Sequence, residues 1–85
     1  MEKSMVLKYI QFGIKNNKIL EILTQKQKKF KIIPLKYQQE KAMLIYKLIN
    51  KNDESRIKLE NIAQIHFAEK EDEDEFLYKI IEDKY

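Results

Sequence analysis

Residues 28–49, KKFKIIPLKYQQEKAMLIYKLI, decide the fold of this chain. Apolar side chains alternate along FKIIPLKY, which is typical of a β-strand. Pro34 cannot donate to a strand ladder, so this strand bends there or lies at a sheet edge. The run AMLIYKLI is apolar on both faces over eight residues, as a strand central to a small barrel would be. A helix from Lys36 to Ile49 is the competing interpretation, because residues 38–42 are good helix formers.

The segments on either side of this stretch also have a period of two. Residues 18–24, KILEILT, alternate before a polar turn at 25–29, and residues 50–55, NKNDES, form a second turn cluster. In residues 56–67, RIKLENIAQIHF, alternation holds except at Asn61 and Ile62. This exception predicts a bend or bulge where one strand passes into the next.

Both ends of the chain have helical patterns. Residues 4–15 place apolar side chains at helical spacing, with Ser4 as the predicted N-cap and an Asn-containing end at 15–17. Residues 70–84 begin with an acidic turn, which complements the helix dipole, and continue with an apolar stripe. The sequence therefore predicts one α+β domain over residues 1–85. A helix at 4–15 precedes five short strands over 18–67, closed into a small β-barrel, and an acidic helix follows at 70–84.

Composition leaves little material for catalysis. The chain has 85 residues, no cysteine, one histidine and one glycine. Disulfides, thiolate metal sites and glycine-rich phosphate loops are therefore excluded. His66 has no nucleophile near it in the sequence, and its spacing to Glu69 and Glu71 matches no metal site. We expect a protein that is not an enzyme and that needs no metal and no cofactor.

The charge of the chain is distributed unevenly. Residues 1–58 hold 14 Lys and Arg against 5 Asp and Glu, a net charge of +9, whereas residues 59–85 hold 3 Lys against 9 Asp and Glu, or −6. A basic body attracts phosphate backbones. The alternative is that both regions are ordinary solvated surfaces. No apolar stretch is long enough to cross a membrane and no secretory signal is evident, so the expected location is cytoplasmic, with no membrane partner.

The order and spacing of these segments resemble the WYL domain family of prokaryotic regulators. FGIKNNKILEI stands where that family has its helix end and first strand, KKFKIIPLKY at its Pro-containing strand, MLIYKLI near its Trp-Tyr-Leu strand and RIKLENIAQI at its closing strand. The resemblance covers about Leu7 to Phe67. It implies an SH3-like or Sm-like five-stranded barrel that senses nucleotides or single-stranded nucleic acid through a basic face.

The chain departs from the WYL pattern at positions that matter for a ligand. Aliphatic residues around Met43, Leu44 and Ile45 replace the family's Trp and Tyr, and Asn61 replaces the second basic residue of the closing motif, whereas Lys58 keeps the first. The resemblance thus supports the barrel better than the ligand site. Without a helix-turn-helix segment, the chain would be a stand-alone WYL-like module, similar to accessory factors of phage-defence systems.

Cationic side chains beside the predicted strands are the candidate ligand-binding residues. In the basic turn around Phe30, the lysines could bind phosphates while the Phe30 ring stacks on a base. The alternative is a turn that only adds solubility, with Phe30 in the core. Lys58 could contact a phosphate as a point charge, and Arg56 could do so with its planar fork, or pair with Asp53 or Glu54. Tyr37 and Tyr46 are expected in the barrel wall. The candidate residues for nucleic acid or a nucleotide are Lys26, Lys28, Lys29, Lys31, Arg56 and Lys58.

The apolar stripe of the C-terminal helix gives the alternative function. These side chains dock the helix on the barrel or, if exposed, form a surface for a protein partner or a homodimer. On this hypothesis the chain is a phage- or mobile-element-type adaptor or inhibitor that uses its acidic C-terminal helix. The candidate partner-binding residues are Phe76, Leu77, Ile80 and Ile81.

Overall fold

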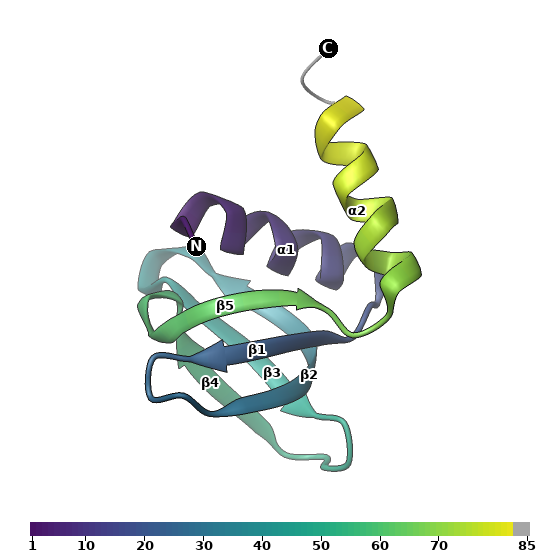
Figure 1. Ribbon diagram of the computed structural model, residues 1–85. Helices are drawn as coiled ribbons and strands as arrows, with labels where there is room; N and C mark the ends of the chain where they lie inside the picture. The colour runs from purple at the N-terminus through teal and green to yellow at the C-terminus, as the bar shows by residue number, and fades with distance from the viewer. Residues whose placement is uncertain (83–85) are drawn as a thin grey trace.

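A computed structural model describes residues 1–82, which form a bent antiparallel sheet preceded along the chain by one helix and followed by another (Figure 1). The α+β class and the single order of helix, five strands and helix are confirmed. Two short 3₁₀ turns interrupt the strands. The elements are α1 (Lys3–Asn16), β1 (Leu20–Thr24), β2 (Lys29–Gln38), η1 (Gln39–Lys41), β3 (Met43–Leu48), β4 (Glu54–Lys58), η2 (Leu59–Asn61), β5 (Ile62–Phe67) and α2 (Lys70–Glu82).

The sheet is open, so the predicted closed barrel is wrong. Its strand order is β4-β3-β2-β1-β5, and every neighbouring pair is antiparallel. Closure would require β4 to pair with β5. Instead η2 turns the chain between them, and β5 pairs with β1 at the opposite edge. Single backbone bonds fix this turn, from Leu59 N–H to the Ala42 carbonyl at 2.8 Å and from Gln25 N–H to the Asn61 carbonyl at 2.9 Å.

β2 has a bulge at its proline. The strand lies between β1 and β3, so it is not an edge strand, and its register with β3 shifts between Pro34 and Lys36. Leu35 is left without a partner opposite it, at the point where the proline removes a ladder donor. The predicted bend at Pro34 is therefore found as a bulge, which lets a ten-residue strand take part in a strongly curved sheet (Figure 1).

The competing helix over residues 36–49 does not form. Helical turns are confined to the three residues of η1, which ends because Ala42 takes a left-handed conformation with φ 48°. β3 then runs between β2 and β4, and Leu44, Ile45 and Tyr46 are all buried in succession. The prediction of a central strand is confirmed, but the strand is central to an open sheet and not to a barrel.

α1 begins one residue earlier than the sequence predicts. Ser4 lies inside the helix, and Glu2 is the N-cap residue, with no side-chain capping bond, so the prediction of Ser4 as N-cap is wrong. The helix ends as expected at Asn17, whose left-handed φ of 55° closes the last turn. α1 packs against β2 and β5. Gly13 allows this close approach, because a Cβ atom there would lie 3.1 Å from Leu20 Cδ1 and 3.2 Å from Pro34 Cγ.

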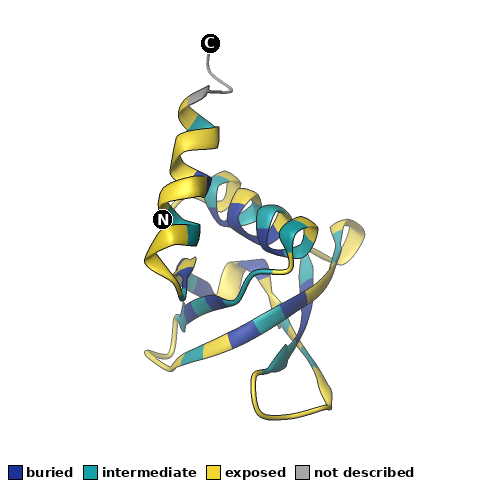
Figure 2. Ribbon diagram, turned by 90° about the vertical axis from the view of Figure 1, so that its right-hand side faces the viewer, coloured by how far each residue is buried: buried dark blue, intermediate teal, exposed yellow. Residues whose placement is uncertain are grey.

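One hydrophobic core fills the space between α1 and the inner face of the sheet. Figure 2 shows buried positions on the side of α1 that faces the strands. Tyr37 is half-buried against this core and Tyr46 is buried in it, so both tyrosines pack inward as predicted, although they belong to an open sheet and not to a barrel wall. The buried members of the core are Val6, Tyr9, Ile10, Leu20, Ile22, Ile32, Leu44, Tyr46, Leu59, Ile62, Ile65, Phe67 and Phe76.

α2 rises away from the sheet beside one end of α1 (Figure 1). Its first two turns contact the body: Phe76 is 2% exposed, and Asp72 pairs with Lys18 at 3.0 Å. Further along, Leu77 is 38% and Ile81 59% exposed. Of the predicted apolar stripe, Phe76 and Ile80 therefore pack against the body, whereas Leu77 and Ile81 do not. The predicted helix extended to residue 84, and its last two positions lie outside the described residues.

Candidate nucleic-acid interface

A row of cations occupies the outer face of β2, β3 and β4. Strand pairing sets Lys36 of β2 opposite Ile45 of β3, and Ile45 opposite Arg56 of β4. Two residues further along β4, Lys58 lies opposite Met43. Because side chains alternate between the faces of a strand, these positions all point away from the core, which receives Leu44 and Ile57 from the intervening positions.

The row continues along β3 towards the hairpin. Lys47 lies opposite Ile33 of β2 and Glu54 of β4. Lys31 is on the same outer face, diagonal to Lys47, so roughly 7–8 Å separates their positions. The sequences of β2, β3 and β4 contain a single acidic residue, Glu54. The outer-face row is Lys31, Lys36, Lys47, Arg56 and Lys58.

Ile45 on the outer face is covered by the side chains of its neighbours. It is only 8% exposed, yet it does not belong to the hydrophobic core, since it points to the opposite side of the sheet. Its cross-strand neighbours are Lys36 and Arg56. The aliphatic stems of such long side chains cover apolar surface while their charged ends stay in water. The cationic groups of Lys36 and Arg56 are therefore presented above a packed apolar centre.

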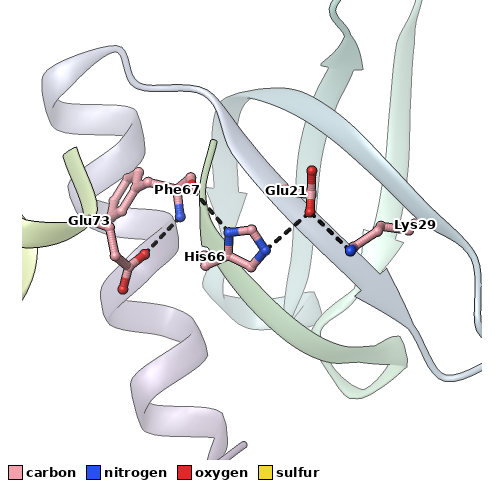
Figure 3. A network of polar contacts seen from close by, with 5 residues as sticks. All are labelled: Glu21, Lys29, His66, Phe67 and Glu73. Carbon is pink, nitrogen blue, oxygen red and sulfur yellow. Dashed lines mark hydrogen bonds and ion pairs between the residues drawn. The ribbon is translucent and has the colours of Figure 1, made fainter. Parts of the chain in front are cut away.

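Lys29 belongs to a different charge environment. Its Nζ lies 3.4 Å from Glu21 Oε1, and the same oxygen lies 3.1 Å from His66 Nε2 (Figure 3). The other imidazole nitrogen, Nδ1, donates to the backbone carbonyl of Phe67 at 2.9 Å. Lys29 is thus partly neutralised by Glu21, and Lys31, which the register sets opposite Glu21, marks the end of the row.

Lys26 and Lys28 lie at the hairpin between β1 and β2. The hairpin is closed by backbone bonds from Thr24 N–H to Lys28 and from Gln27 N–H to Thr24, and Gln27 takes a left-handed φ of 67°. Both lysines border a hollow of about 270 Å³ that also reaches Ile57 and Asn61. Ile57 faces the core side of β4, so this hollow lies at the end of the core and not on the outer face.

The six predicted cations are therefore divided among three places. Lys31, Arg56 and Lys58 share the outer-face row, Lys29 pairs with Glu21, and Lys26 and Lys28 border the hairpin hollow. Sequence reasoning missed Lys36 and Lys47. Alternation along β3 puts Lys47 outward, whereas Lys36 faces outward because the bulge at Leu35 shifts the alternation of β2. Only the register between strands brings the two lysines beside Arg56 and Lys31.

Aromatic rings from the strands do not contribute to this outer face. Phe30 packs against the core, and its ring is stacked with Tyr46 at a centroid distance of 5.9 Å. Tyr37 also faces the core side. Of the two interpretations of Phe30, the core position is confirmed, so the basic hairpin has no stacking platform from this residue.

The predicted partner-binding residues also separate. Phe76 is buried in an aromatic cluster with Tyr9, Phe12 and Phe67, at centroid distances of 4.2, 5.3 and 5.4 Å. Ile80 borders a hollow between α1 and α2, whereas Leu77 and Ile81 are exposed. Phe76 therefore holds α2 in place together with Ile80, which packs against the core, and Leu77 and Ile81 are left exposed for contact.

Among the side chains of residues 1–81, three groups have perturbed pKa values, and all lie away from the outer-face cations. Burial raises the pKa of the Tyr9 hydroxyl, as do its hydrogen bond to Glu73 and the charge of that carboxylate. Burial also raises the pKa of Tyr46, which a hydrogen bond with Ser55 partly offsets. The pKa of Lys18 is raised because its ammonium bonds to Asp72. These shifts mark structural contacts.

The described part of the chain offers no assembled metal site. Within residues 1–82, no three His, Asp and Glu side chains come close enough together to hold a metal ion. No helix in this range is long and apolar enough to cross a membrane. No family model matches the chain, and comparisons with curated proteins and with solved structures find no match. The function must therefore be argued from the surface chemistry.

Proposed function

We propose that this protein is a non-catalytic regulatory or accessory module that binds nucleic acid through the outer face of β2, β3 and β4. The observation that carries the proposal is the register, which gathers Lys31, Lys36, Lys47, Arg56 and Lys58 on one face with Glu54 as the only acidic residue in those strands. Clustered cations of this kind neutralise phosphates and release counterions, which drives binding.

The spacing of the cations suits a phosphate backbone. Arg56 and Lys58 are two positions apart on one strand, which corresponds to about 6.8 Å. Lys36 and Arg56 flank Ile45 across two strand spacings, or roughly 10 Å. Arg56 supplies a planar fork that can hold two phosphate oxygens, and the lysines act as mobile point charges. A flexible polyanion can therefore contact several of these groups at once.

Phosphate contacts, not base stacking, are the basis of this binding. The aromatic side chains of β2 and β3 face the core, so the outer face provides no ring on which a base could stack. Stacking is what single-strand binders without sequence preference usually add to a basic groove. We therefore expect weak sequence preference and strong dependence on salt concentration.

The resemblance to WYL domains supports the same class of ligand. Lys58, the basic residue that the closing motif keeps, belongs to the outer-face row. Asn61, at the second basic position of that motif, lies in η2, and its carbonyl accepts the bond from Gln25. On this proposal the chain is a degenerate WYL-like module in which Lys36 and Lys47 supply the positive charge that Asn61 lacks. A sensor that binds a single nucleotide is the narrower form of the same hypothesis.

Fluorescence anisotropy with labelled RNA and DNA, single- and double-stranded, tests the proposal at several salt concentrations. In the variant R56Q/K58Q we expect weaker binding and a slope of log K against log salt that is smaller by about 1.5–2. The matched control K3Q/K70Q removes the same charge from exposed positions on the two helices. Absence of binding to every probe at low salt, or an equal loss in the control, contradicts the proposal.

A protein-interaction module is the second candidate. The observation that favours it is the exposure of Leu77, Tyr78 and Ile81 on the part of α2 that leaves the body. Exposed apolar side chains in a contiguous patch mark contact surfaces. On this proposal α2 carries the contact, as an adaptor or inhibitor would use it, and nucleic-acid binding is absent at all salt concentrations.

A further inference from the structure

The two helices enclose a hollow that the nucleic-acid proposal does not use. It has a volume of about 430 Å³ and opens between α1 and the outer part of α2. Its floor is apolar and consists of Phe12, Phe76 and Ile80. Its rim carries three cations, Lys8, Lys15 and Lys79, with the amides of Gln11 and Asn16 between them.

The basic rim follows one face of α1. Lys8, Gln11, Phe12 and Lys15 are spaced by three, one and three residues, which places them together on a helical surface. The rim continues on α2, where Lys79 Nζ lies 5.6 Å from the centre of the Phe12 ring. We call this set of eight residues, the three floor and five rim residues named above, the interhelical groove.

The opposite face of α2 has complementary chemistry. Glu71, Asp74, Tyr78 and Ile81 are spaced by three, four and three residues and so form one stripe. Its first half is acidic and exposed, and its second half is apolar, with Tyr78 70% and Ile81 59% exposed. Leu77 lies beside it at 38% exposure. We call these five residues the outer stripe of α2.

One face of helix α2 contacts the body, from Asp72 as far as Ile80, which packs against the core. Glu73 and Phe76 contact the end of β5 and the aromatic cluster, and Asp72 contacts Lys18. The turns after Phe76 project away from the sheet (Figure 1). A short helical segment that leaves apolar side chains in water is marginal on its own and gains stability from packing.

We infer that the outer stripe of α2 from one copy packs into the interhelical groove of a second copy, giving a symmetric dimer. The charges match, because the acidic half of the stripe meets Lys8 and Lys15 while the apolar half covers Phe12 and Ile80. The lengths are similar as well, since the groove is lined by residues 8–16 of α1 and the stripe covers residues 71–81 of α2, which rise by about 12 and 15 Å along their helices.

A two-fold axis satisfies both surfaces at once. Each copy carries one groove and one stripe, so the second copy's α2 fills the first groove while the first copy's α2 fills the second. The outer face of β2, β3 and β4 takes no part in this contact. The dimer and the nucleic-acid binding therefore use different surfaces, and each can be tested without the other.

Charge reversal in two separate variants tests the arrangement by sedimentation velocity. The groove variant K8E/K15E and the stripe variant E71K/D74K each place like charges together, so each should be monomeric, with a dimer dissociation constant raised about 10-fold or more. An equimolar mixture should dimerise again. In the mixed dimer, the acidic groove of K8E/K15E contacts the basic stripe of E71K/D74K. In the other contact, the native basic groove of E71K/D74K meets the native acidic stripe of K8E/K15E.

A charge reversal elsewhere on the surface shows whether the effect is specific to the groove and the stripe. The variant K41E/K51E reverses two exposed charges outside the contact and should dimerise like the unaltered protein, and far-ultraviolet circular dichroism should show that all variants fold. A monomeric unaltered protein, a dimer that survives either reversal, or a mixture that stays monomeric overturns the inference. Binding of an acidic amphipathic peptide to a monomeric unaltered protein would assign the groove to a different occupant and also overturn it.

Discussion

The carboxylate of Glu73 in α2 accepts a hydrogen bond from the backbone N–H of Phe67 at the end of β5, with an N–O distance of 2.9 Å. Its second oxygen accepts the hydroxyl of Tyr9 in α1. One side chain thus joins both helices to the last strand, on the side of Phe67 opposite His66 (Figure 3). The direction in which α2 leaves the body depends on this carboxylate.

Replacing Glu73 by alanine should lower the free energy of unfolding by about 2 kcal/mol. The change leaves the Phe67 N–H and the Tyr9 hydroxyl without their acceptor, and hydrogen bonds to charged groups contribute about 1.5–3 kcal/mol. Urea denaturation measures the loss. The control E75A removes an exposed carboxylate two positions along and should change stability by less than about 0.5 kcal/mol. Equal effects of the two changes would contradict the role of Glu73.

Stability should fall at alkaline pH, and Tyr9 should account for part of the fall. Its pKa is raised in the folded state, so above about pH 10 the unfolded chain loses the phenolic proton while the folded chain keeps it. The contribution is complete below the unfolded pKa and is lost as pH rises towards the folded value. The raised pKa values of Lys18 and Tyr46 act in the same direction.

The variant Y9F tests this origin of the alkaline sensitivity. Phenylalanine cannot ionise, so the decline of the melting temperature between about pH 9 and 11 should become shallower. Y78F removes the hydroxyl of a tyrosine that is 70% exposed and should leave the decline as it is. A decline in Y9F as steep as in the unaltered protein would show that Tyr9 is not responsible.

Gly13 should not tolerate alanine, although alanine is the better helix former. Helix propensity alone favours the change by about 1 kcal/mol. The new Cβ, however, would lie 3.1 Å from Leu20 Cδ1 and 3.2 Å from Pro34 Cγ, and both neighbours are buried. We expect G13A to reduce the free energy of unfolding by about 1–2 kcal/mol. S4A, at an exposed position of the same helix, provides the control, and a gain of stability in G13A would contradict the close packing.

The order of the helices and strands could be predicted from the sequence, but the pairing of the edge strands β4 and β5 could not. Alternation at residues 56–67 and the break at Asn61 and Ile62 predicted two strands joined by a bend, which η2 confirms. Whether β4 then pairs with β5 depends on long-range geometry, because each strand is equally able to pair at either edge. The left-handed Ala42, which ends η1 and starts β3, has no sequence signal of the kind that Asn17 carries.

The candidate site could be predicted only in part, because the register between the strands is not visible in the sequence. Arg56 and Lys58 are outward on their own strand by alternation alone, which the sequence shows. Lys36 lies after the bulge at Leu35, and the bulge changes which positions of β2 face outward. Its position beside Ile45 therefore follows from the register, and the same register sets Lys47 beside Ile33.

The outer-face row and the basic hairpin can be separated by two matched double variants. K36Q/K47Q removes two charges from the row, and K26Q/K28Q removes the same charge from the hairpin hollow. If nucleic acid binds across β2, β3 and β4, the first variant should reduce the slope of log K against log salt by about 1.5–2. The second should reduce the slope by less than half as much, and anisotropy titrations measure both. The reverse order would move the interface to the hairpin and contradict the outer face as its centre.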